Sequence, residues 1–102
     1  GNGVVLSGQS GLAGDSMLYS FEVPAGASNL NLRSFGGSGD ISLLVKAGSA
    51  PAENGSDADF TSARPGNTET VVIAKPQATT YYVRVVGMAN YNDLSLLGIY
   101  VN

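Results

Sequence analysis

The side chains that most hydrolases use for catalysis are missing from this sequence. Its 102 residues include no His and no Cys, which removes the common nucleophile–base pairs of acyl-transfer enzymes. A Ser–Lys pair of the S-x-x-K type is also absent, because Leu43 stands at that spacing before Lys46 and Val72 before Lys75. The sequence therefore predicts a domain with no catalytic activity of its own.

A glycine-rich segment, Gly36-Gly37-Ser38-Gly39-Asp40, has a superficial likeness to a catalytic serine turn or a phosphate-binding loop. The final glycine of a G-x-S-x-G motif is missing, and a strand rather than a helix is predicted to follow. The Lys-Ser/Thr pair of a P-loop is absent, and Ser42 replaces the third glycine of a dinucleotide fingerprint. We interpret the segment as a tight turn.

Eight carboxylates remain as candidates for chemistry. Asp57 and Asp59 lie in a polar stretch, and Asp40 follows the glycine-rich turn. Solvated carboxylates are one interpretation, a glycosidase pair is another, and a calcium site that uses Asp40, Asp57 and Asp59 is a third, since Ca²⁺ prefers oxygen ligands. No EF-hand spacing is present, so we expect at most weak calcium binding, at ~10⁻⁴–10⁻³ M. Zinc is not expected without imidazole or thiolate ligands.

Charge and hydropathy exclude two classes of partner. The net charge is −3, and the five basic residues are scattered along the chain, whereas nucleic-acid binding needs a cationic face. No apolar run approaches the ~18 residues of a membrane span. We therefore expect no nucleic-acid partner, no membrane partner and a monomeric domain.

The elements that must position these residues are predicted to be β-strands. Polarity alternates with a period of two in segments 17–23, 29–33, 41–46, 69–73 and 81–86, and apolar runs occupy 4–6 and 94–101. Gly- and Pro-rich turns separate the segments, and the stretch from Ala47 to Pro65 is predicted to be irregular. No segment has helical spacing with caps at both ends.

Seven or eight short strands with one apolar face each need a second sheet to cover them. The sequence therefore predicts an all-β fold, a two-sheet antiparallel β-sandwich, with a closed barrel as the alternative. The expected core is Tyr19, Phe21, Leu30, Leu32, Ile41, Leu43, Val45, Val71, Ile73, Tyr81, Val83, Val85 and Leu96. We expect residues 1–102 to form a single domain, excised from a larger exported protein because the chain begins Gly1-Asn2-Gly3.

The chain carries an ordered set of short motifs, which are Val23-Pro24-Ala25-Gly26, Asn29-Leu30, Gly36-Gly37-Ser38-Gly39-Asp40, Lys46-Ala47-Gly48-Ser49-Ala50-Pro51, Gly66-Asn67-Thr68-Glu69-Thr70, Thr80-Tyr81-Tyr82-Val83-Arg84-Val85 and the closing Tyr91 to Val101. This set resembles the bacterial pre-peptidase C-terminal domain. The set covers nearly the whole chain, and no single piece is specific. Three positions depart from the family, since Phe60 and Val71 stand where many members carry Cys, and Ser42 replaces an acidic residue.

The resemblance implies a jelly-roll-like sandwich that serves as a non-catalytic accessory domain of a secreted metallo- or serine peptidase. Three functions follow as alternatives. The domain targets the peptidase to insoluble protein such as collagen, or it is a processing or secretion segment that is removed during maturation and has no ligand. The third is a carbohydrate-binding or adhesive module on a parent that is not a peptidase.

A ligand face can be predicted from the alternation of one strand. Tyr81 and Tyr82 are neighbours and must point to opposite faces, so a buried Tyr81 would leave Tyr82 and Arg84 outward. An aromatic ring beside a guanidinium suits a polar, fibrous ligand. We therefore expect the contact to use Tyr82 and Arg84, joined by Tyr91 or Tyr100, unless Tyr82 packs under a loop.

Overall fold

Eight β-strands form where the sequence alternates, and no segment is helical. The computed structural model describes residues 1–102, and it contains no helix long and apolar enough to cross a membrane. Only β5 was not predicted, since it lies inside the stretch expected to be irregular. The strands are β1 (Val5–Gly11), β2 (Ser16–Glu22), β3 (Ser28–Phe35), β4 (Ile41–Ala47), β5 (Phe60–Ser62), β6 (Glu69–Ile73), β7 (Thr80–Gly87) and β8 (Tyr91–Val101).

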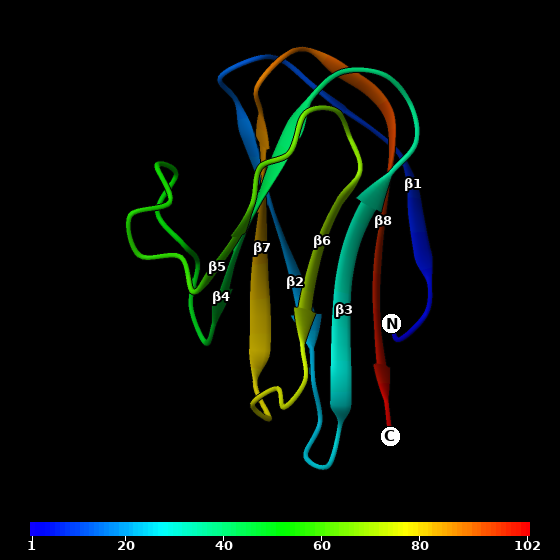
Figure 1. Ribbon diagram of the computed structural model, residues 1–102, viewed down its shortest axis with the longest axis vertical. Helices are drawn as coiled ribbons and strands as arrows, with labels where there is room; N and C mark the ends of the chain where they lie inside the picture. Colours follow the sequence, from blue (N-terminus) through cyan, green and yellow to red (C-terminus); the bar gives the residue numbers. More distant parts are fainter.

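The strands form two four-stranded antiparallel sheets, with the orders β1-β8-β3-β6 and β2-β7-β4-β5. Every connection except the one from β4 to β5 passes from one sheet to the other (Figure 1). The chain thus passes back and forth between the two layers of the sandwich. The predicted two-sheet sandwich is confirmed, and the closed barrel is wrong because the sheets do not join into one.

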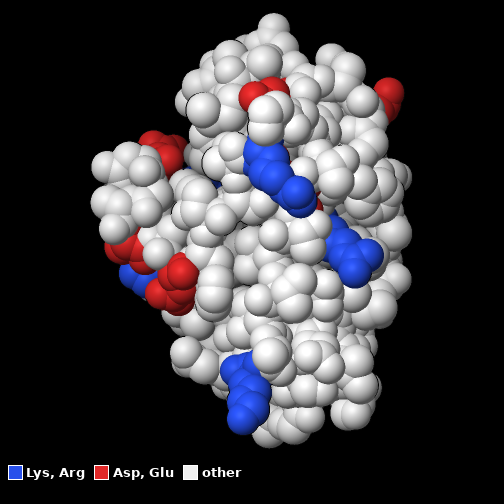
Figure 2. Space-filling model, in the orientation of Figure 1, with Lys and Arg blue, Asp and Glu red and all other residues white.

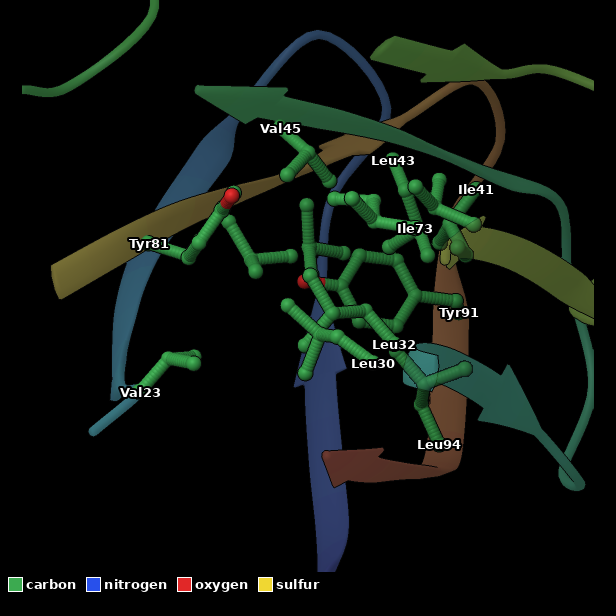
Figure 3. Close-up of a cluster of buried hydrophobic side chains, with 13 residues drawn as sticks. Val23, Leu30, Leu32, Ile41, Leu43, Val45, Ile73, Tyr81, Tyr91 and Leu94 are labelled. Carbon is green, nitrogen blue, oxygen red and sulfur yellow. The ribbon is translucent and has the colours of Figure 1, made fainter. Parts of the chain in front are cut away.

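The core lies between the sheets and consists of the inward residues of the alternating strands (Figure 3). Buried positions alternate with exposed positions in β6 and with partly exposed positions in β7. Ten predicted core residues are buried, whereas Tyr19, Phe21 and Leu96 are only partly buried against the cluster. Val23, Tyr91 and Leu94 also belong to the core.

The glycine-rich segment is a turn, as predicted, and it connects β3 to β4. Gly37 and Gly39 have positive φ values of 65° and 116°, and a Cβ atom at either position would collide with the backbone of residues 90–93. The Asn67 side chain holds the turn by donating to the carbonyls of Gly36 and Ser38, at 3.0 and 2.9 Å. Ser38 is therefore part of a packed turn.

The edge of the sandwich formed by β5 and β6 is sealed by a buried carboxylate. Glu69 is fully buried, and its Oε1 accepts hydrogen bonds from Ser62 Oγ at 2.6 Å and from the Arg64 amide at 3.0 Å. The Thr70 amide also donates to Ser62 Oγ, at 3.3 Å. These bonds link the two sheets along this edge.

Candidate binding surface

The predicted face lies on the outer side of the sheet β2-β7-β4-β5. Tyr81, Val83 and Val85 of β7 are buried, while Tyr82 and Arg84 between them are partly exposed on the opposite side. Tyr82 lies in register with Ser20 of β2 and Lys46 of β4. The strand therefore separates its two tyrosines as the alternation predicted, and Tyr82 has polar neighbours on both sides.

Arg84 is bound within the domain rather than free for a ligand. Its Nε donates to the Pro51 carbonyl at 2.9 Å, and its NH1 donates to Ser16 Oγ at 3.1 Å. Glu53 Oε1 lies 3.8 Å from the same NH1 and accepts a hydrogen bond from Ser16 Oγ at 3.0 Å. Only 15% of the Arg84 side chain is exposed. The residue fixes the connection between β4 and β5 onto the sheet, which corrects its predicted role as an open donor.

The connection from β4 to β5 folds over part of the outer face and projects from the body of the molecule (Figure 1). Pro51 is buried, and Gly55 approaches the Leu44 side chain so closely that an added Cβ would lie 3.1 Å from it. The Asp57 carboxylate accepts from the Ala52 amide at 2.7 Å and from Lys46 Nζ at 2.9 Å. These two bonds, the amide first, hold the Asp57 pKa below its usual value.

The predicted calcium ligands do not come together. Asp40 accepts from the Gly66 amide at 3.0 Å, and Asp59 accepts from the Ala47 amide at 2.9 Å. No group of three or more carboxylates is placed to hold a metal ion, although acidic side chains gather on the side where the β4–β5 connection projects (Figure 2). Each of the three carboxylates thus has a structural role, and calcium binding stays a prediction.

Tyr91 and Tyr100 do not belong to the outer face. Tyr91 is a core residue, 2% exposed, and its ring packs so closely on Gly11 that a Cβ there would lie 2.6 Å from its hydroxyl. Tyr100 packs against the core and makes an edge-to-face contact with Phe21, with ring centroids 5.9 Å apart. The predicted contact with a ligand is therefore wrong for the buried Tyr91.

An irregularity in β8 explains the burial of Tyr91. Asp93 has a φ of 56°, and this left-handed residue interrupts the alternation so that Tyr91 and Leu94 both reach the core. Beyond Asp93 the period of two resumes, which places Leu96 and Tyr100 on the inward side with Leu94. Gly11, which pairs with Tyr91, leaves room for the large ring because it has no side chain.

The sandwich fold and the absence of a catalytic constellation agree with the comparisons with known proteins. The model of the bacterial pre-peptidase C-terminal domain family matches residues 15–87. The solution structure described as "vEP C-ter 100" superposes with a TM-score of 0.73 at 33% identity, and covers 95% of this chain and 97% of that one. The chain belongs to the family of bacterial pre-peptidase C-terminal domains.

Similar sequences occur within bacterial proteases. The chain is 35% identical over 102 residues to the alkaline serine exoprotease A of Vibrio alginolyticus. The match covers 97% of this chain and 18% of the relative. The neutral protease of Vibrio proteolyticus is 36% identical, and the match covers 92% of this chain and 15% of the relative. The extracellular protease of Xanthomonas campestris pv. campestris is 38% identical, and the match covers 97% of this chain and 17% of the relative.

The chain thus spans less than a fifth of the length of these three relatives. All three are proteases by name, and one of them is named as a serine protease. Domains of this family are described as C-terminal, and the domain itself is non-catalytic, as predicted.

Proposed function

We propose that this domain is an extracellular accessory domain of a secreted bacterial peptidase, and that it helps to target the enzyme to insoluble protein. The observation that carries the proposal is the family membership, together with relatives that are proteases several times longer than the chain. A domain that recurs beside different proteases and has no catalytic residues is suited to a task that these enzymes share. Attachment to a substrate that cannot diffuse is such a task.

The surface around Tyr82 supports this proposal. The ring stands on the central strand β7 between Ser20 and Lys46, and the Arg84 and Asp57 bonds hold the adjacent β4–β5 connection in place. Tyrosine on a rigid strand offers a large contact area at a small cost in conformational entropy. The polar neighbours supply donors and acceptors for a hydrated protein surface.

Replacement of Tyr82 tests this surface directly. Tyr82→Ala should weaken co-sedimentation of the chain with insoluble collagen by about 1–2 kcal/mol, roughly a tenfold loss of affinity. The variant should remain folded with a moderate fall in melting temperature, because the ring is only partly exposed. Val72→Ala is the matched control, since Val72 is 57% exposed on the opposite sheet and should retain full binding.

Three results would count against the proposal. If Tyr82→Ala and the unaltered chain sediment with collagen to the same extent, Tyr82 is excluded as a contact. Unfolding of the variant would give Tyr82 a structural role instead. Failure of the unaltered chain to sediment with collagen or other insoluble proteins would favour a segment that only assists secretion or processing.

A further inference from the structure

The edge of the sandwich between β1 and β2 is open, in contrast to the sealed edge between β5 and β6. Tyr19 and Phe21 of β2 point inward but remain partly exposed, and Leu6 of β1 is 46% exposed. One side-chain hydrogen bond links the two strands, from Tyr19 Oη to Gln9 Oε1 at 2.9 Å. The inner surfaces of the two sheets are therefore accessible from this side.

An apolar cavity lies behind this opening. Its volume is about 140 Å³, and most of its lining residues are hydrophobic. Both sheets contribute, with Tyr19, Phe21 and Val83 on one side and Leu6, Leu32 and Leu96 on the other. A cavity of this size lined by aliphatic and aromatic groups admits one benzene-sized apolar group, such as a single leucine side chain.

The strand beside the cavity is able to pair with another strand. β2 is an edge strand, bonded only to β7, and its register runs without a shift from Ser16 to Glu22. It contains no Lys and no Pro, and Met17 on its inward side is 50% exposed. By contrast, two register shifts interrupt β1. Bulges, lysines and prolines are the usual protection of an edge, and β2 has none of them.

We propose that β2 binds an extended segment of a protein substrate by strand addition, and that one apolar side chain of this segment enters the cavity. Main-chain hydrogen bonds would supply affinity independent of sequence, and the cavity would select an apolar residue. The proposal rests on the proposed function for the identity of the partner as a substrate protein. It adds a site distinct from Tyr82, which lies on the outer face of the same sheet.

A second copy of the chain fits the cavity less well than an extended segment does. In a β2–β2 pair, two of the inward side chains that the copy presents, Tyr19 and Phe21, already pack against the core of the copy. Only Met17, which is 50% exposed, is free to enter the opening. An extended segment from a different chain has its alternate side chains free.

The test uses the complete chain and the soluble probe peptide acetyl-KTVTLTVK-amide, followed by amide and methyl chemical shifts. We expect the largest shifts at residues 16–22 and at the methyl groups of Leu6 and Leu96. The peptide acetyl-KTVTATVK-amide should bind about tenfold more weakly, because it lacks the side chain that fills the cavity.

Two protein variants separate strand addition from nonspecific attraction. Met17→Lys places an inward-pointing charge on the β2 edge and should abolish peptide binding, with little change in melting temperature because Met17 is half exposed. Val72→Lys adds the same charge at an exposed position of the edge strand β6 and should leave binding unchanged.

The proposal is overturned by equal binding of the two peptides, by binding that survives Met17→Lys, or by shifts confined to the surface around Tyr82. Concentration-dependent self-association that Met17→Lys abolishes would assign the edge to a second copy and overturn it too. If the peptide binds at β2 but the chain does not sediment with insoluble protein, the proposed function fails while the strand-addition site stands.

Discussion

The phenol rings of Tyr91 and Tyr19 pack against the apolar core, and this burial has a chemical consequence. Desolvation raises the pKa of each hydroxyl above the ordinary value of 10.0. The negative charge of Asp15 raises the pKa of Tyr91 further, and the charge of Tyr91 raises the pKa of Tyr19 further. The folded state therefore favours the neutral phenol more than the unfolded state does.

The sign of the pH dependence follows from this difference. Both states hold neutral phenols below about pH 10, the unfolded value. As the pH rises past this value, the unfolded chain loses its phenol protons first, so stability falls as the pH passes through the raised folded pKa values. We expect the melting temperature to decrease above about pH 10, and Tyr91→Phe to reduce this decrease. A Tyr91→Phe curve parallel to that of the unaltered chain between about pH 8 and 11 would contradict the account.

Burial at these residues was only partly predictable from sequence. Tyr81 and Tyr82 were separated correctly because β7 keeps a regular period of two. Tyr91 was not, because its inward position depends on the left-handed conformation of Asp93, and a non-glycine residue with positive φ leaves little trace in a sequence. Glu69 was likewise missed as a core residue, since a buried carboxylate is revealed only by its partners Ser62 and Arg64.

The strands and the β4–β5 connection illustrate what can be predicted for elements. Strands with clean alternation were found together with their inward faces, because burial on one face imposes the period. β5 was missed because three residues are too few to show a period. The connection before it was predicted to be irregular, and its attachment to the sheet by Arg84 depends on contacts distant in sequence.

Arg84→Ala tests the attachment of this connection. The substitution removes the bonds to the Pro51 carbonyl and Ser16 Oγ, and we expect it to lower the free energy of unfolding by about 1–3 kcal/mol. Amides of residues 48–59 should exchange faster with solvent, because their anchor is lost. Arg33→Ala is the control, since the one side-chain partner of Arg33 is the side chain of Asn31. Similar losses in the two variants, or unchanged exchange in residues 48–59, would show that Arg84 does not hold the connection.

For the whole molecule, the two long edges of the sandwich have different roles. The β5–β6 edge is closed by Glu69 and Ser62, whereas the β1–β2 edge is open to an apolar cavity. The surface around Tyr82 lies on the outer side of the sheet to which β2 belongs. The two proposed binding sites for protein thus lie on one sheet, which suits the proposed accessory role beside a protease.

We propose that the domain promotes the action of an attached protease on insoluble protein without chemistry of its own. The most direct measurement fuses this chain to a protease catalytic domain that lacks such a module, and compares hydrolysis of collagen fibrils with hydrolysis of the same collagen after it has been dissolved by heating. We predict faster hydrolysis of the fibrils by the fusion, an unchanged rate on the dissolved protein, and no hydrolysis by the chain alone. Equal rates on fibrils with and without the domain, or an equal gain on both forms of the substrate, would contradict the account.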